Sequence, residues 1–108
     1  MFLYIGSYTE PGMGEGSGIS LTTFDPATGV LDPIQAIVAA ENPSYLTLSA
    51  DNAFLYSVNE LETERANEVS TGGVTAYARD TESGALRRLN SQLTGGVHPC
   101  YLSIDPTG

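Results

Sequence analysis

Five polar residues fall where they could form one binding or catalytic site: Tyr8, Asn42, Asn59, Glu60 and His98. Asn42 and His98 occupy matching places in two similar stretches of the chain, and each precedes a proline. A histidine can transfer a proton near neutral pH, and amide, phenol and carboxylate groups can hold a polar ligand. We therefore take these residues as candidates for lining a polar channel.

Four of the candidates also have a purely structural interpretation. A short polar side chain before an extended X-Pro pair can hydrogen-bond nearby backbone, which would account for Asn42 and His98. Tyr8 ends an apolar run and could cover the core. Glu60 opens an acidic stretch that could be a solvated loop. The other acidic members of that stretch are Glu62, Glu64 and Glu68.

Three other features of the sequence do not indicate a catalytic, nucleotide-binding or metal site. Cys100 is expected to be a small buried side chain, because it lies on the apolar side of its run and no base is paired with it. The glycine-rich stretch 9–18, TEPGMGEGSG, precedes a strand rather than a helix, so it does not fit a dinucleotide-binding loop. A single histidine without metal-ligand spacing predicts neither a metal site nor a cofactor.

The elements that must position the candidates are repeated. Residues 42–52, NPSYLTLSADN, return 56 places later as HPCYLSIDPTG, and residues 18–31, GISLTTFDPATGVL, return 55 places later as GVTAYARDTESGAL. The runs FLYIGSY and FLYSVNE stand 52 places apart. The small differences in spacing must be taken up in loops, which tolerate them.

The repeated runs are typical of strands, because they are rich in Val, Ile, Thr, Tyr and Phe and are separated by turn residues. We expect strands within 2–8, 18–24, 33–39, 44–50, 54–60, 73–79, 85–93 and 100–105. A repeat of about 50 residues with four strands indicates a blade of a β-propeller. The sequence thus predicts an all-β fold, a partial β-propeller of which about two blades are present.

The predicted blades divide the chain into three parts. Blade one, without its inner strand, takes residues 1–40, blade two takes 41–95, and blade three begins at 96–108. Antiparallel pairing then places the tight turns SADN, DPATG and DTESG at one end of the sheets. The longer polar connections 9–17 and 61–72 fall at the other end, where binding residues usually lie.

Charge limits the partners that this chain can have. Thirteen acidic residues against four arginines and no lysine give a formal charge of −9. Nucleic acid and anionic membranes are not expected partners, because both require clustered cations. No export signal or long apolar segment is visible, and a single cysteine fits a reducing compartment. The expected location is the cytoplasm.

The ordered segments YIGSYTE, GISLTTFDPATGVL, ENPSYLTLSADNAFLYSVNE, GGVTAYARD and GGVHPCYLSIDPTG resemble the opening of the seven-bladed lactonase propellers. That family includes 6-phosphogluconolactonases and fungal carboxymuconate lactonising enzymes. The resemblance covers the whole chain and implies the N-terminal portion of a longer enzyme that opens a small anionic sugar lactone with water. The leading substrate that it implies is 6-phosphogluconolactone.

Two other functions stay open. One is a cycloisomerase acting on carboxymuconate-type lactones, and the other is a non-enzymatic propeller used as an interaction module.

The resemblance places the family's catalytic His, Glu and Arg mainly in later blades, so no catalytic residue is assigned and the chain alone is expected to be inactive. Only Arg65 among the arginines is expected at the channel end. Unpaired strands at 2–8 and 99–105 also predict self-association.

Overall fold

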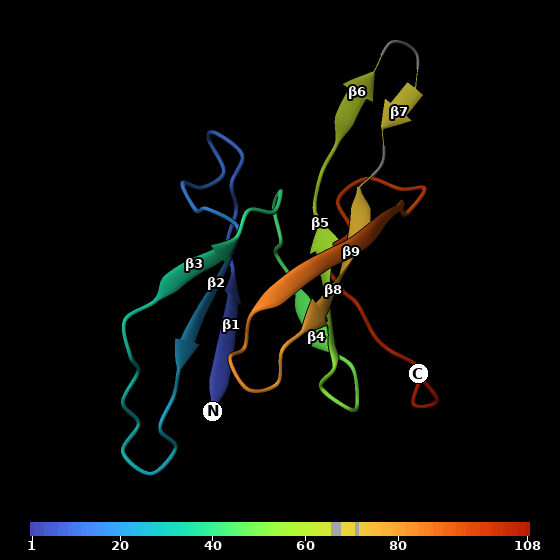
Figure 1. Ribbon diagram of the computed structural model, residues 1–108. Helices are drawn as coiled ribbons and strands as arrows, with labels where there is room; N and C mark the ends of the chain where they lie inside the picture. The colour runs from blue at the N-terminus through green and yellow to red at the C-terminus, as the bar shows by residue number, and fades with distance from the viewer. Residues whose placement is uncertain (66–67, 71) are drawn as a thin grey trace.

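The computed structural model describes residues 1–65, 68–70 and 72–108, and all regular structure in them is β. A three-stranded sheet has the order β1 (Phe2–Gly6), β2 (Ile19–Thr23) and β3 (Gln35–Val38). A four-stranded sheet has the order β4 (Leu46–Leu48), β5 (Phe54–Asn59), β8 (Gly73–Arg79) and β9 (Leu86–Leu93). A separate hairpin joins β6 (Thr63–Arg65) to β7 (Glu68–Ser70) (Figure 1). None of the described segments forms a helix with the length and apolar character needed to span a membrane.

The two larger sheets have the blade pattern that the sequence predicts. Every pair of neighbouring strands is antiparallel, and each sheet follows the chain order from one edge to the other. The second sheet has four strands, whereas the first begins at β1 with no strand inside it among the described residues. The all-β fold is therefore confirmed, and the sheets fall within the predicted blades at 1–40 and 41–95. Those blade boundaries stay a prediction.

Aspartate-initiated turns join the outer two strands of both sheets in the same way. The Asp25 carboxylate accepts a hydrogen bond from the Ala27 N–H at 2.9 Å, and the Asp80 carboxylate accepts one from the Glu82 N–H at 2.8 Å. Each turn closes at a glycine with positive φ, 75° at Gly29 and 77° at Gly84. Glycine adopts this left-handed conformation without steric cost. The repeated sequences therefore encode the same turn twice.

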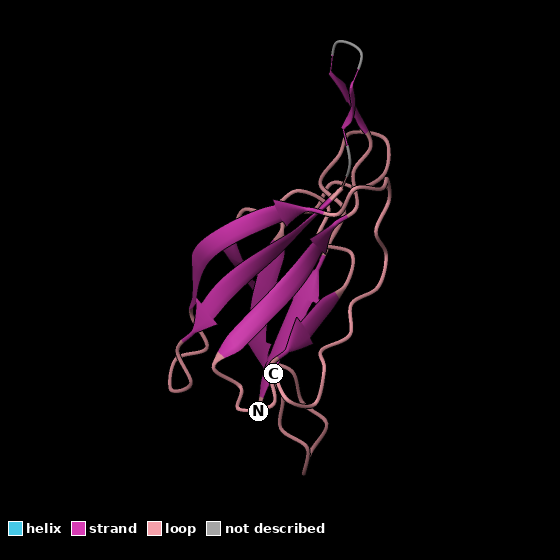
Figure 2. Ribbon diagram, turned by 90° about the vertical axis from the view of Figure 1, so that its right-hand side faces the viewer, coloured by secondary structure: helices cyan, strands magenta, loops and turns pink. Residues whose placement is uncertain are grey.

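The hydrophobic core lies between the two sheets. Its buried members are Ile19 of β2, Leu55 of β5 and Tyr77 of β8. Partly buried side chains from both sheets pack around them: Tyr4, Val38, Ala40, Leu46 and Leu86. Figure 2 shows the two sheets stacked beside one another, with the β6–β7 hairpin extending beyond them. Each sheet thus buries its inner face against its neighbour, as blades of a propeller must.

Arg79 reinforces this contact at the end of the tight turns. Its Nε donates to the Tyr4 hydroxyl at 2.7 Å, and its Nη1 donates to the Asn52 carbonyl at 3.0 Å. The guanidinium also lies 5.5 Å from the centre of the Phe2 ring. The Tyr4 hydroxyl in turn donates to the Gly84 carbonyl at 2.6 Å. One arginine of the second sheet is therefore held by aromatic residues of the first.

Two expectations about local structure are wrong. Residues 100–105 do not form a strand, since no described strand lies beside them to complete the hydrogen-bond ladder. Cys100 is consequently exposed rather than buried, and the Tyr101 ring lies against the Tyr45 ring at an interplanar angle of 45°, with centroids 4.7 Å apart. The connection 61–72 also contains regular structure that the sequence did not predict, the β6–β7 hairpin. Its charged sequence shows no alternation that would have predicted strands.

Candidate functional site

The connections separate into two ends of the molecule, as the sequence predicts. In Figure 1 the loop after β1, the β6–β7 hairpin and the loop after β9 lie at the upper end. The turns after β2, β4 and β8 lie at the lower end. We refer to the upper end, formed by residues 7–18, 40–44, 60–65, 68–70, 72 and 94–98, as the loop end.

A hydrogen-bonded carboxylate stands at the loop end. The Tyr8 hydroxyl donates to Glu60 Oε2 at 2.8 Å, and the Ser44 hydroxyl donates to the same oxygen at 2.5 Å. Tyr8 follows β1 and Glu60 follows β5, while Ser44 precedes β4. All three side chains are partly buried. The cluster therefore joins the two blades and brings Tyr8 and Glu60 together, as their sequence positions suggest.

The hydrogen bonds fix the charge of this cluster. The bond from Ser44, followed by the bond from Tyr8, lowers the pKa of Glu60, and the nearby His98 acts in the same direction while burial opposes it. The bond to Glu60 is also the main reason why the pKa of Tyr8 is raised. Glu60 is therefore an ionised acceptor and Tyr8 a neutral donor at neutral pH. A carboxylate in this state can hold a hydroxyl group but has no proton to give as a general acid.

Asn42 lies at the same end, but its side chain is fully covered. Its Oδ1 accepts hydrogen bonds from the backbone N–H groups of Thr9 and Glu10 at 2.9 and 3.0 Å. Its Nδ2 donates to the Glu10 carboxylate and to the Glu60 carbonyl, both at 3.1 Å. Asn42 therefore fastens the loop after β1 to the second blade instead of facing open space.

Asn59 also has a structural position. Its Nδ2 donates to the Glu41 carbonyl at 2.8 Å, and its Oδ1 accepts from the Thr75 hydroxyl at 2.7 Å. Successive side chains of a strand point to opposite faces, so Asn59 at the end of β5 turns away from the side that Glu60 occupies. The structure does not bring Asn59 into the Tyr8–Glu60 cluster.

His98 is the exposed counterpart of Asn42. Its Nε2 lies 3.1 Å from Glu62 Oε2, and the two side chains are 45% and 53% exposed. Its backbone N–H donates to the Leu61 carbonyl at 3.2 Å. His98 and Asn42 both have positive φ, 51° and 39°. His98 is therefore open to a ligand, and its role in binding stays a prediction.

Sequence reasoning missed Ser44 and gave Glu62 only a solvated role. Ser44 lies two residues after Asn42, so the strand period would place it on the same side of the chain. Glu62 lies two residues after Glu60, which is the spacing that also separates Glu10 from Tyr8. Both spacings are present in the sequence.

The arginines do not form an anion clamp in the described structure. Arg79 is held at the tight-turn end, and Arg88 on β9 donates to the Ser91 hydroxyl at 2.6 Å. Arg65 falls on β6, where side chains lie outside the described part of the structure, as do those of Glu64 and Glu68. The expectation that Arg65 faces the channel stays a prediction.

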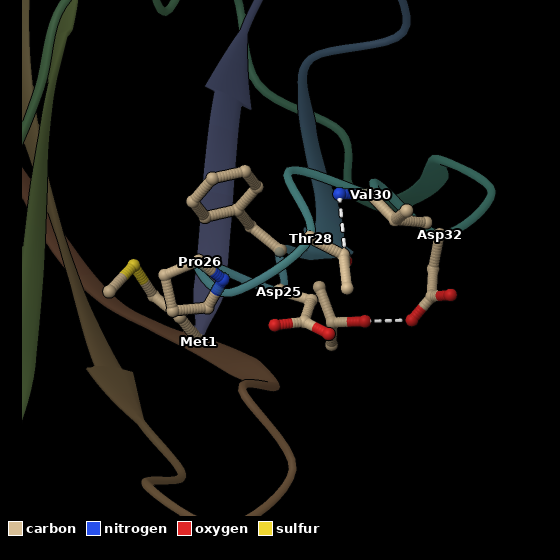
Figure 3. Close-up of a pocket in the computed structure, with 8 residues that line it drawn as sticks. Met1, Asp25, Pro26, Thr28, Val30 and Asp32 are labelled. Atoms are coloured by element: carbon tan, nitrogen blue, oxygen red, sulfur yellow. Dashed lines mark hydrogen bonds between the residues drawn. The ribbon is translucent and has the colours of Figure 1, made fainter.

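An open groove of about 590 Å³ lies at the opposite end, beside the turn after β2 (Figure 3). Apolar atoms of Met1, Phe24 and Pro26 line it together with Asp25 and Asp32. The Thr23 hydroxyl donates to the Asp32 carboxylate, and the Asp25 carboxylate is engaged in its own turn. These groups already serve the turn, so the groove is not a candidate for the polar site.

A family model described as "Lactonase, 7-bladed beta-propeller" matches residues 2–108. The chain belongs to this family. It is 33% identical over 102 residues to the 6-phosphogluconolactonase of Bacillus subtilis (strain 168), a match that covers 94% of this chain and 26% of that protein. The resemblance inferred from the ordered motifs is confirmed.

Solved structures agree with this assignment. A Bacteroides fragilis protein, provisionally named a 6-phosphogluconolactonase, superposes with a TM-score of 0.81 at 37% identity, covering 97% of this chain and 27% of that one. The periplasmic gluconolactonase of Pseudomonas aeruginosa superposes with a TM-score of 0.74 at 33% identity, covering 89% and 25%. The present chain thus spans about a quarter of the length of its relatives.

Proposed function

We propose that this chain forms the first part of a sugar-lactone hydrolase whose leading substrate is 6-phosphogluconolactone. The observation that carries the proposal is the match of residues 2–108 to the lactonase propellers, together with relatives named 6-phosphogluconolactonase. In this reaction the oxygen of water bonds to the lactone carbonyl carbon and the ring carbon–oxygen bond breaks. The ring oxygen takes up a proton, and the products are a carboxylic acid and a hydroxyl group, here 6-phosphogluconate. The enzyme would serve the pentose phosphate pathway of carbohydrate metabolism.

The residues of this chain would bind substrate rather than carry out the bond-breaking step. Glu60 is an ionised acceptor, and Tyr8 and His98 offer hydrogen-bonding groups at the same end. A general base for water and donors for the developing oxyanion are also required. We propose that these groups come from the rest of the protein, so that residues 1–108 alone have no lactonase activity.

A second substrate deserves a test because one similar structure is named a gluconolactonase. Purified full-length protein should be assayed with 6-phosphogluconolactone, gluconolactone and a carboxymuconate lactone, by base consumption and with correction for spontaneous hydrolysis. Saturable hydrolysis of 6-phosphogluconolactone supports the proposal. Activity on the muconate lactone alone would favour the cycloisomerase, and no activity on any lactone would favour an interaction module.

We also propose a cytoplasmic enzyme that binds neither nucleic acid nor membranes. Its net charge of −9 and its single cysteine support this. One relative is periplasmic, so fractionation of cells that produce the protein, followed by immunoblotting, is the appropriate test. Recovery in the periplasmic fraction would overturn the proposed location.

Self-association of the 108-residue chain is proposed through β1 and the segment 99–105. Among the described residues β1 pairs only with β2, and residues 102–104 correspond in the repeat to Leu46–Leu48, which pair with Leu55–Ser57 of β5. A second copy would thus place Ile104 opposite Leu3. Light scattering at rising concentration should detect association that S103P abolishes and S103T retains, because proline removes a backbone donor. A monomer at all concentrations would refute strand donation.

A further inference from the structure

The loop end is strongly acidic. Among the side chains that the structure describes, its segments carry the carboxylates of Glu10, Glu15, Glu41, Glu60 and Glu62. His98 is the basic residue of that described set and is paired with Glu62, while Arg65 lies on β6, whose side chains lie outside the described part. Even with His98 charged, acidic groups dominate the described part of this end.

The remaining cations of the chain are placed elsewhere. Arg79 is held between Phe2 and Tyr4 beside the tight turns, and Arg87 and Arg88 lie on β9, the outermost strand. A phosphate group brought to the loop end would therefore approach carboxylates. The repulsion between like charges grows as they come closer and as water is excluded from the site.

Glu60 is suited to bind a hydroxyl group of a sugar lactone rather than its phosphate. Its Oε2 already accepts two hydrogen bonds, and among the described residues none reaches its Oε1. Tyr8 and Ser44 fix the carboxylate through one oxygen only, and the other can accept a donor from a ligand. A sugar lactone offers hydroxyl donors on its ring and side chain, and hydrogen bonds to a charged acceptor are the stronger kind.

We propose that Glu60, positioned by Tyr8 and Ser44, accepts a hydrogen bond from a hydroxyl group of the lactone, and that the substrate's phosphate points away from these two blades. The first two blades would thus recognise the uncharged polyol part, whereas cations supplied by other blades would hold the phosphate. This inference rests on the proposed lactonase function and goes beyond it, because it assigns a substrate orientation and a specificity residue.

The test compares a phosphorylated with an unphosphorylated substrate in the full-length protein. Glu60→Gln should lower kcat/KM about 10-fold for 6-phosphogluconolactone and for gluconolactone alike, because it removes a charged acceptor from a hydroxyl that both share. Tyr8→Phe should lower kcat/KM for both substrates by one common factor, and this factor should be smaller than that of Glu60→Gln. Glu82→Gln, the same change of charge in an exposed turn at the far end, should leave both unchanged.

A set of gluconolactones that each lack one hydroxyl group separates contact from a structural effect. Glu60→Gln should reduce hydrolysis of every member except the one that lacks the hydroxyl bound by Glu60. Equal losses on all members would show that Glu60 acts only on the fold, and circular dichroism of each variant checks folding directly.

Three other outcomes are decisive. A selective gain on the phosphorylated substrate in Glu60→Gln would place the phosphate beside Glu60 and overturn the proposed orientation. Unchanged kcat/KM on both substrates would overturn the hydroxyl contact. If the unmodified protein hydrolyses neither lactone, the proposed function fails, and this result is distinct from either failure of the Glu60 assignment.

Discussion

His98 Nε2 lies 3.1 Å from Glu62 Oε2, the same distance that separates Asn42 Nδ2 from Glu10 Oε2. The two pairs occupy corresponding places in successive blades. Asn42 contacts Glu10, which lies two residues after Tyr8. His98 contacts Glu62, which lies two residues after Glu60, the residue that corresponds to Tyr8 in the repeat. An amide in one blade is thus replaced by an imidazole in the next, and the contact is kept.

This correspondence predicts that asparagine can replace His98. Asparagine tolerates positive φ and can donate to Glu62. The free energy of unfolding of His98→Asn should therefore lie within about 0.5 kcal/mol of that of the original protein. His98→Ala loses the contact, and alanine adopts a φ of 51° less readily than histidine or asparagine, so this change should cost about 1–2 kcal/mol. Urea unfolding measures both. His98→Gly separates the two causes, since it relieves the backbone but lacks the contact; equal stability of the Ala and Asn variants would contradict this account.

Asn42→Ala should be much more destabilising. It removes a buried side chain and leaves the N–H groups of Thr9 and Glu10 without their acceptor, so we expect a loss of about 3 kcal/mol or more. Asn90→Ala changes the same side chain at an exposed site on β9 and should cost less than about 0.5 kcal/mol. Chemical denaturation of the two variants gives the comparison. Similar losses would mean that the Asn42 hydrogen bonds contribute little.

Arg79→Lys should weaken the contact between the blades although it keeps the charge. Lysine lacks the planar group that bonds Tyr4 and Asn52 at once while lying over Phe2. We expect a loss of about 1–2 kcal/mol in the free energy of unfolding. Arg87→Lys, on an exposed part of β9, is the matched control and should change stability by less than about 0.5 kcal/mol. Equal effects at the two sites would show that charge alone matters at Arg79.

Acid should destabilise the protein partly through the turn at Asp80. Hydrogen bonds from the backbone of Ser83 and then Glu82 lower the pKa of the Asp80 carboxyl. Its folded pKa therefore lies below the unfolded value of about 3.9, so its contribution is present above that pH and is lost as pH falls through the folded pKa.

Asp80→Asn should accordingly make the unfolding free energy less dependent on pH below about pH 4. The asparagine side chain can still accept the two backbone hydrogen bonds, so the turn itself is retained. Unfolding curves collected at several pH values give the slope for each protein. A slope unchanged by the substitution would show that Asp80 does not contribute to acid sensitivity.

The internal repeat is the reason why most of the fold could be predicted. Matching strands and turns recur because each blade has the same geometry, and the turns at Asp25 and Asp80 are alike down to the glycine that closes them. The segment 100–105 has the same pattern as β4 but no strand beside it in the described part of the chain, and a strand depends on its neighbour as much as on its own sequence. Among the strands that the structure describes, the β6–β7 hairpin has no second copy that could have revealed it.

The candidate site was less predictable for two physical reasons. Proximity along the chain placed Asn59 with Glu60, although neighbouring residues of a strand face opposite ways. Residue type alone also cannot separate a polar group that serves the fold from one that is open to a ligand. Asn42 and His98 differ in this respect because the loop after β1 covers the first, whereas the second is about half exposed.

The core shared by Ile19, Leu55 and Tyr77 has a consequence for biosynthesis. Leu55 and Tyr77 face each other within the second sheet and Ile19 comes from the first, so the second blade finds its partner in the segment made immediately before it. Chains are made from the N-terminus and domains fold as they appear. The array can therefore grow by successive docking, and until a ring closes apolar surface stays exposed at its two ends, on the first blade and on the most recently completed one.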